Sequence, residues 1–178
     1  MKIYPNQINL LLELISSNKI KGVLFYGPNS GLISAIVKEI VTKLELVSSN
    51  IEYSDLDDAY IFGKAGELNF FNKKELIRVS SVKTTITQNI KIALSECKNW
   101  NIFCFVTENS LPINGIRSFF ESKPYLVSIG CFFENNIGIK NIVINKITKN
   151  NFSIMQDALQ FISTKFEGDN ALLENELE

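Results

Sequence analysis

The chain has 178 residues, of which 46% are hydrophobic, and a net charge of −1 at neutral pH with a pI near 5.7. This length is sufficient for one full hydrophobic core and a smaller second module. The charge excludes a basic field that would hold nucleic acid through its phosphates, so any action on DNA is expected to go through partner proteins.

Several classes of site and location are excluded by residue content. No run of about 18 apolar residues occurs, and the N-terminus lacks the apolar stretch of a signal peptide, so we expect a cytoplasmic protein without a membrane partner. The chain has no histidine, which removes imidazole metal ligands and histidine-activated nucleophiles. Cys104 and Cys131 lie in apolar, strand-like runs and are expected to be buried free thiols.

Hydrophobic periodicity predicts helices and strands that alternate along most of the chain. In chain order we expect a helix from residue 5 to about 16, a strand at 23–26, a helix at 32–44, a strand at 50–56, a helix at 57–66, a strand at 73–82, a helix at 86–97, a strand at 101–108, a short helix at 113–123, and strands at 125–134 and 141–147.

Such alternation, with strands that are apolar throughout, indicates an α/β fold with a parallel sheet covered on both faces. The pattern ends near residue 148. Residues 153–156 then fit a capping box that would open a helix, and a further helical segment begins near residue 168. The sequence therefore predicts one α/β domain, residues 1–148, followed by a partial helical domain, residues 149–178.

The stretch LFYGPNSGLISAIVKEI has the outline of a phosphate-binding loop, with an apolar strand, a glycine turn and a helix. Counted from Gly27, the second glycine and the lysine of such a loop should occupy positions 32 and 33, where the chain has Leu32 and Ile33. Only Ser34 matches the hydroxyl position. If the register is shifted so that Gly31 is the second glycine, Leu32 stands where the lysine is needed. Gly27 and Gly31 are therefore expected to serve the turn alone.

The acidic half of a nucleotide site is also weak, because the apolar strand at 101–108 ends in Thr107 and Glu108 where an Asp for the metal would be expected. We accordingly expect no metal and no cofactor. The alternative is a divergent P-loop ATPase or kinase that binds Mg·ATP through Ser34 and the loop backbone.

Four stretches in order resemble one family, the delta subunit of the bacterial DNA polymerase III clamp loader. They are GVLFYGPNSGLISAIV, NFFNKKELIRV, LPINGIRSFFESKPYLVSIGCFFEN and GDNALLENELE. The resemblance covers essentially the whole chain. A sibling loader subunit with a structural role is a further reading, but that relative usually carries a cysteine zinc module and no C-x₂-C occurs here.

The resemblance implies an AAA+-type first domain with a degenerate P-loop, followed by the start of a small helical lid domain. It also implies a clamp-loader subunit that binds and opens the beta sliding clamp during DNA replication without its own ATPase activity. The chain would then be no enzyme by itself, although the polymerase holoenzyme is. DNA would be contacted only indirectly, and assembly with other clamp-loader subunits would depend on a collar domain that the chain lacks.

The family binds the clamp with a Leu-Phe pair before the third strand, and the matching residues here are Phe70 and Phe71, with Leu68 just before them. The departure is a phenylalanine in place of the leucine. The residues themselves agree, because two adjacent aromatics among polar neighbours cannot both face the core from one side of a regular element. The opposing reading is that both rings are ordinary core.

A second Phe pair and a set of carboxylates are weaker candidates. Phe119 and Phe120 follow two isoleucines at helical spacing, so core packing is expected. Asp57 and Asp58 are expected to stabilise a helix start instead of forming an acid–base pair.

Overall fold

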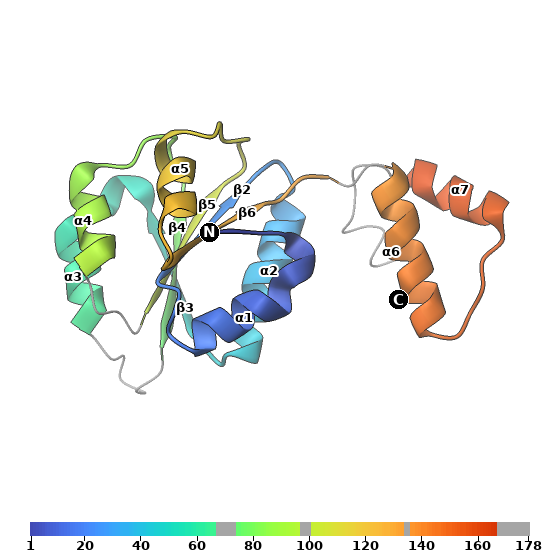
Figure 1. Cartoon of the computed structure of the whole chain (residues 1–178), viewed down its shortest axis with the longest axis horizontal. Coiled ribbons are helices and arrows are strands. Elements are labelled where there is room, and N and C mark those ends of the chain that lie inside the picture. Colours follow the sequence, from blue (N-terminus) through green and yellow to red (C-terminus); the bar gives the residue numbers. More distant parts are fainter. Residues whose placement is uncertain (67–73, 97–100, 134–135, 167–178) are drawn as a thin grey trace. The chain divides into compact units, whose positions relative to one another are not determined.

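The computed structural model describes residues 1–66, 74–96, 101–133 and 136–166, and the chain divides into two compact units, Met1–Cys131 and Phe132–Glu178. The first unit contains a six-stranded parallel sheet in the order β1-β6-β2-β5-β4-β3 (Figure 1). The strands are β1 (Lys2–Ile3), β2 (Gly22–Tyr26), β3 (Val47–Glu52), β4 (Glu75–Ser80), β5 (Ile102–Thr107) and β6 (Leu126–Gly130).

Helices cover both faces of this sheet (Figure 1). They are α1 (Ile8–Ser16), α2 (Ser30–Lys43), α3 (Asp58–Gly66), α4 (Gln88–Glu96) and α5 (Gly115–Ser122). Successive side chains of a strand point to opposite faces. Val23 and Phe25 of β2 therefore pack with α1 and α2, while Leu24 packs in the core formed with α3, α4 and α5. The α/β sandwich predicted from the sequence is confirmed.

The two edges of the sheet differ from its centre. All five residues of β2 and all six of β5 are buried, whereas no residue of edge strand β3 is fully buried. The other edge strand, β1, has only two residues. Cys104 and Cys131 are buried as expected, and burial raises the pKa of each thiol to about 12.

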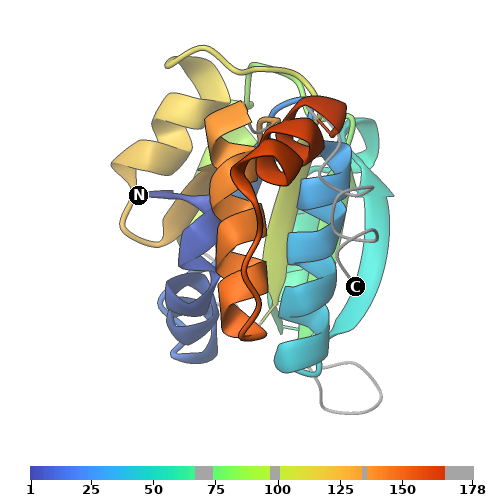
Figure 2. The same cartoon turned by 90° about the vertical axis from the view of Figure 1, so that its right-hand side faces the viewer.

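The second unit contains two helices, α6 (Asn136–Lys149) and α7 (Gln156–Lys165), which pack against each other (Figure 2). Their small core contains Ile139, Val143 and Phe166. Among the described residues, no helix is long and apolar enough to cross a membrane.

Three expectations are wrong in this part of the chain. Residues 141–147 belong to helix α6, not to a strand, because their apolar side chains face α7 at helical spacing. The division between units accordingly falls after Cys131, earlier than the expected boundary at 148. The capping box at 153–156 does not form, since Met155 is extended (φ −68°, ψ 148°) and α7 begins only at Gln156.

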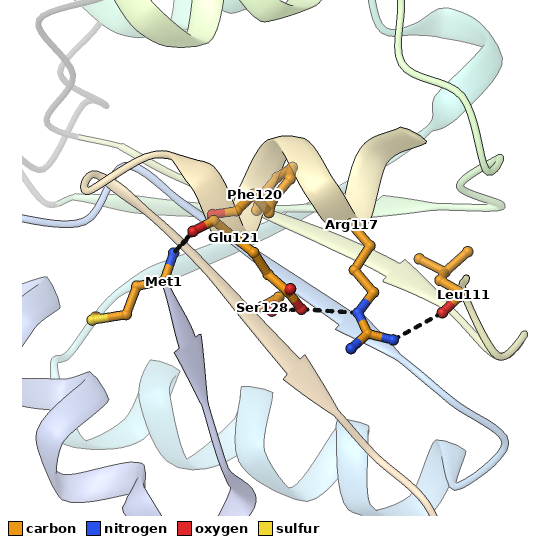
Figure 3. A network of polar contacts seen from close by, with 6 residues as sticks. All are labelled: Met1, Leu111, Arg117, Phe120, Glu121 and Ser128. Carbon is orange, nitrogen blue, oxygen red and sulfur yellow. Dashed lines mark hydrogen bonds and ion pairs between the residues drawn. The ribbon is translucent and has the colours of Figure 1, made fainter. Parts of the chain in front are cut away.

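A polar network fixes α5 against the sheet (Figure 3). The Arg117 Nε lies 2.8 Å from the Glu121 Oε1, and the Ser128 hydroxyl donates to the same carboxylate oxygen at 3.1 Å. A second guanidinium N–H donates to the Leu111 carbonyl at 3.1 Å. The Met1 amino group donates to the Phe120 carbonyl at 2.9 Å, which satisfies an acceptor near the end of the helix.

The stability of this network is predicted to depend on pH. Burial opposes ionisation of Glu121, but the hydrogen bonds from Arg117 and Ser128 outweigh it and hold the pKa of this carboxyl below its ordinary value of 4.5. A lowered folded-state pKa stabilises the fold above the unfolded-state pKa, and the contribution is lost as pH falls through the folded-state pKa.

We expect Glu121→Gln to lower the free energy of unfolding by about 1–2 kcal/mol at pH 7, with a smaller difference from the parent in acid. Urea unfolding at both pH values measures this. Glu39→Gln, which removes an exposed i,i+4 pair with Lys43, is the matched control and should cost no more than about 0.5 kcal/mol. A Glu121→Gln effect of the same size in acid would contradict the assignment.

Candidate functional site

The turn after β2 has the backbone of a phosphate loop but is closed by the chain itself. Gly27 has φ +124°, and its N–H donates to the carbonyls of Thr107 (3.2 Å) and Asn109 (3.1 Å). A Cβ at Gly27 would lie 2.2 Å from the Cys131 carbonyl oxygen. Glycine is therefore required here by a close contact with the chain after β6, independent of any ligand.

The amide groups that would cradle a phosphate are already used. The Asn29 N–H donates to the Cys131 carbonyl at 3.2 Å, and the buried Asn29 side chain accepts from the Leu32 N–H at 2.9 Å. The Ile33 N–H donates to the Asn29 carbonyl at 3.1 Å, as the first bonds of α2 form. Asn29 thus caps the helix and occupies N–H groups that an anion would need at a helix N-terminus.

The side chains of this loop give no cation. Ile33 is 0% exposed and packs in the core beneath α2, and Leu32 packs at the border of that core. Gly31 lies in the first turn of α2, and Ser34 is exposed on the same helix. The structure therefore keeps Gly27, Gly31 and Ser34 near one helix start, without a lysine between them.

The neighbouring strand ends lack an acid suited to a metal. Thr107 ends β5 as a buried residue, and its hydroxyl accepts from the Asn109 N–H at 3.4 Å. Ser80 ends β4 and donates to Glu52 at 2.8 Å. Glu108 is exposed. Across the described part of the chain, no three His, Cys, Asp or Glu side chains are grouped to hold a metal ion.

The second candidate, Leu68, Phe70 and Phe71, lies outside the described residues. These three belong to residues 67–73, called here the contact segment, which connects the end of α3 to the start of β4. The described residues on either side of it, Lys64 in α3 and Glu75 at the start of β4, lie near the amino ends of β4 and β5, where both contact Asn101.

The two ends of the contact segment are held together by described residues. The buried Asn101 donates from its side-chain amide to the Lys64 carbonyl at 2.7 Å and accepts from the Glu75 N–H at 2.9 Å. Lys64 and Glu75 also form an ion pair at 3.3 Å. We call Lys64, Glu75 and Asn101 the segment anchor. Sequence reasoning missed Asn101, although a polar residue next to the most apolar strand was a signal.

Two lesser candidates have the structural roles expected from the sequence. Phe120 is 0% exposed and contacts Phe105 edge to face at 5.3 Å, and Phe119 packs partly buried beside it. The Asp57 carboxylate accepts from the Tyr60 N–H at 2.7 Å at the start of α3. The core packing expected of the Phe pair and the helix-start role expected of Asp57 are both confirmed.

Comparison with known proteins finds one curated relative in sequence. The chain is 33% identical over 177 residues to a Rickettsia prowazekii protein named probable DNA polymerase III subunit delta, a match that covers 99% of the chain and 55% of that protein. No protein-family model matches the chain. The chain thus spans about half the length of the curated relative it matches.

Solved structures share the fold at low sequence identity. The Bacillus subtilis DNA clamp loader delta protein YqeN matches with a TM-score of 0.70 and 10% identity, over 96% of this chain and 56% of that one. A Thermotoga maritima RuvB variant matches with a TM-score of 0.50 and 13% identity, over 89% of this chain and 54% of that one. These likenesses confirm the AAA+-type α/β fold. The sequence match by itself shows that the chain is a relative of a protein named as a delta subunit of bacterial DNA polymerase III, of which it spans about half.

Proposed function

We propose that the chain belongs to a clamp-loader subunit that binds the beta sliding clamp and favours its open form without hydrolysing ATP itself. The observation that carries the second half of this proposal is the closed loop at Gly27. Its amides are bonded to Asn29 and Cys131, and Ile33 is buried where a phosphate-binding lysine would be needed. The names of the two relatives support the first half.

The contact segment is the proposed clamp-binding element. Phe70 and Phe71 would enter an apolar pocket on the clamp, with Leu68 beside them, and the polar neighbours in the sequence would form the rim of the interface. The segment anchor supports this role. A loop whose ends are fixed by a buried side chain loses less conformational entropy when it binds.

Opening of the clamp would follow from a difference in affinity. Binding energy shifts a closed-to-open equilibrium only as far as the ligand prefers the open form. The chain would therefore need contacts that fit the open shape better than the closed ring. ATP control would come from partner motor subunits, and DNA would be contacted indirectly. Nucleotidyl transfer would belong to the polymerase of the complex.

The first prediction concerns the two aromatic rings. The double variant Phe70→Ala, Phe71→Ala should lose at least about 30-fold in affinity for the sliding clamp of the same bacterium, because each hot-spot ring contributes about 2–4 kcal/mol. Calorimetry measures the affinity, and circular dichroism checks the fold. Ile113→Ala, which shortens a side chain that is 74% exposed elsewhere, is the control and should bind normally. Undiminished binding by the double variant would remove the assignment.

The second prediction concerns the segment anchor. Asn101→Ala leaves the Glu75 N–H and the Lys64 carbonyl without this partner, so we expect a loss of about 1–3 kcal/mol in stability. Clamp affinity should fall several-fold as well, because the segment ends are no longer fixed. Asn150→Ala, which removes an exposed contact to the Lys146 carbonyl, is the control and should have little effect on either. Parent-like clamp affinity in Asn101→Ala would show that the anchor does not prepare the segment.

The third prediction separates this function from a divergent ATPase or kinase. A site of micromolar affinity at 100-fold excess ligand would add about 2.7 kcal/mol of stability and raise the melting temperature by several degrees. We expect ATP to give the same melting temperature with and without Mg²⁺. A magnesium-dependent rise of several degrees, reduced by Ser34→Ala, would favour the enzyme instead.

A further inference from the structure

A pocket lies at the carboxyl ends of β4 and β5, and no residue from Gly27 to Ser34 lines it. Its volume is about 740 Å³. The polar residues that line it include two cations, one carboxylate and several hydroxyl groups: Arg78, Lys83, Glu108, Ser80, Ser81, Thr84, Thr85 and Thr107. The carboxyl edge of an open α/β sheet is where ligands usually bind.

Arg78 is the distinctive residue of this pocket. It lies on β4 and is partly buried, and its side chain has neither an ion pair nor a hydrogen bond among the described residues. Its partner in the β4–β5 register is Cys104, whose thiol remains neutral because burial raises its pKa to about 12. A guanidinium with no protein acceptor keeps its N–H donors available to an anion.

The other arginine of the chain shows the contrast. Arg117 is bonded to Glu121 at 2.8 Å and to the Leu111 carbonyl at 3.1 Å, and lies 4.8 Å from the centre of the Tyr26 ring. The fold therefore supplies one arginine with an acid, a carbonyl and an aromatic face. The other arginine, Arg78, has none of these partners among the described residues and lines the solvent-accessible pocket.

The loop that forms one wall, residues 81–85, is held in place from two sides. The Thr84 carbonyl accepts from the Ile116 N–H at 2.9 Å, and the Thr85 carbonyl accepts from the Tyr53 hydroxyl at 2.9 Å. Gly115 permits this approach, since a Cβ there would lie 2.1 Å from the Thr84 carbonyl oxygen. The hydroxyl-bearing wall is thus preformed, which lowers the entropy cost of binding.

The pocket carries charges of both signs. Arg78 and Lys83 supply two positive charges and Glu108 one negative charge, and the exposed Glu52 carboxylate accepts from the Ser80 hydroxyl beside them. Glu108 is exposed and can turn toward solvent, whereas Arg78 is fixed on a central strand. Thr84 and Thr85 line the same space and carry further hydroxyl donors, whereas the Ser80 hydroxyl is bonded to Glu52.

We propose that this pocket binds a phosphate group, with the Arg78 guanidinium as its main ligand and the loop hydroxyls and Lys83 as further donors. The planar guanidinium can donate two parallel hydrogen bonds to phosphate oxygens. The proposal does not depend on clamp binding, because none of the residues that line the pocket belongs to the contact segment or to the segment anchor.

The chain contains only two arginines, which makes a direct test possible. In ¹H–¹⁵N spectra, titration with inorganic phosphate at constant ionic strength should shift the Nε–H signal of Arg78 and leave that of Arg117 in place. Equal shifts of both signals, or no shift of either, would overturn the proposal. This measurement uses the unaltered chain, so it remains decisive if a variant fails to fold.

Variants then test the ligand role. Arg78→Gln should weaken phosphate binding at least about tenfold and abolish the thermal stabilisation by phosphate, because one charge-assisted bidentate contact is removed. Arg78→Lys should keep part of the affinity. Lys38→Gln, an equal charge change on the exposed face of α2, is the control. An equal loss in Lys38→Gln would attribute the effect to net charge and contradict the proposal.

The source of the phosphate group is distinguished by three titrations under the same conditions. Inorganic phosphate, phosphoserine and ADP share the ligand chemistry but differ in what is attached to it. Each that shifts Arg78 selectively supports the site, and the strongest identifies the natural class. Failure of all three would reject the site.

Discussion

The close approach of Gly27 to the backbone after β6 is the constraint on which the candidate site depends. A Cβ at position 27 would lie only 2.2 Å from the Cys131 carbonyl oxygen, so only glycine fits there. This contact brings the Asn29 N–H to the same carbonyl and positions Asn29 to cap α2. A turn of this kind is folded by its own chain, so no bound nucleotide is needed to hold it. The contact with Cys131 thus accounts for the glycine of this loop without a bound phosphate.

The amino ends and the carboxyl ends of the strands of the parallel sheet are proposed to have separate functions. The amino ends lie beside the segment anchor with Asn101, and the carboxyl ends hold the closed loop and the Arg78 pocket. The strands that connect the two ends of the sheet are hydrogen-bonded in parallel to their neighbours. A ligand at one end of the strands could affect the other end only by a change in this sheet. We therefore expect partner binding and anion binding to be weakly coupled.

Much of the fold could be predicted from the sequence because it depends on local patterns. The buried strands β2 and β5 are predicted by their own apolar runs. The start of α3 is predicted by the carboxylate of Asp57, which caps a residue three positions away. The strand expected at 141–147 was a helix because β-branched residues also occupy helical faces when a partner helix covers them. Asn101 and Arg78 could not be assigned, since the roles of both depend on residues far away in the chain.

The borders of the sheet have a consequence for how the protein associates. Edge strand β3 is polar and exposed along much of its length, and the opposite edge strand, β1, has two residues. Neither offers a long apolar backbone ladder to a stray strand, which is the usual route to fibrous aggregation. The sheet of this chain is therefore protected from strand-to-strand association at both of its edge strands. Contacts with other molecules are then made through side chains, which are more selective than backbone pairing between strands.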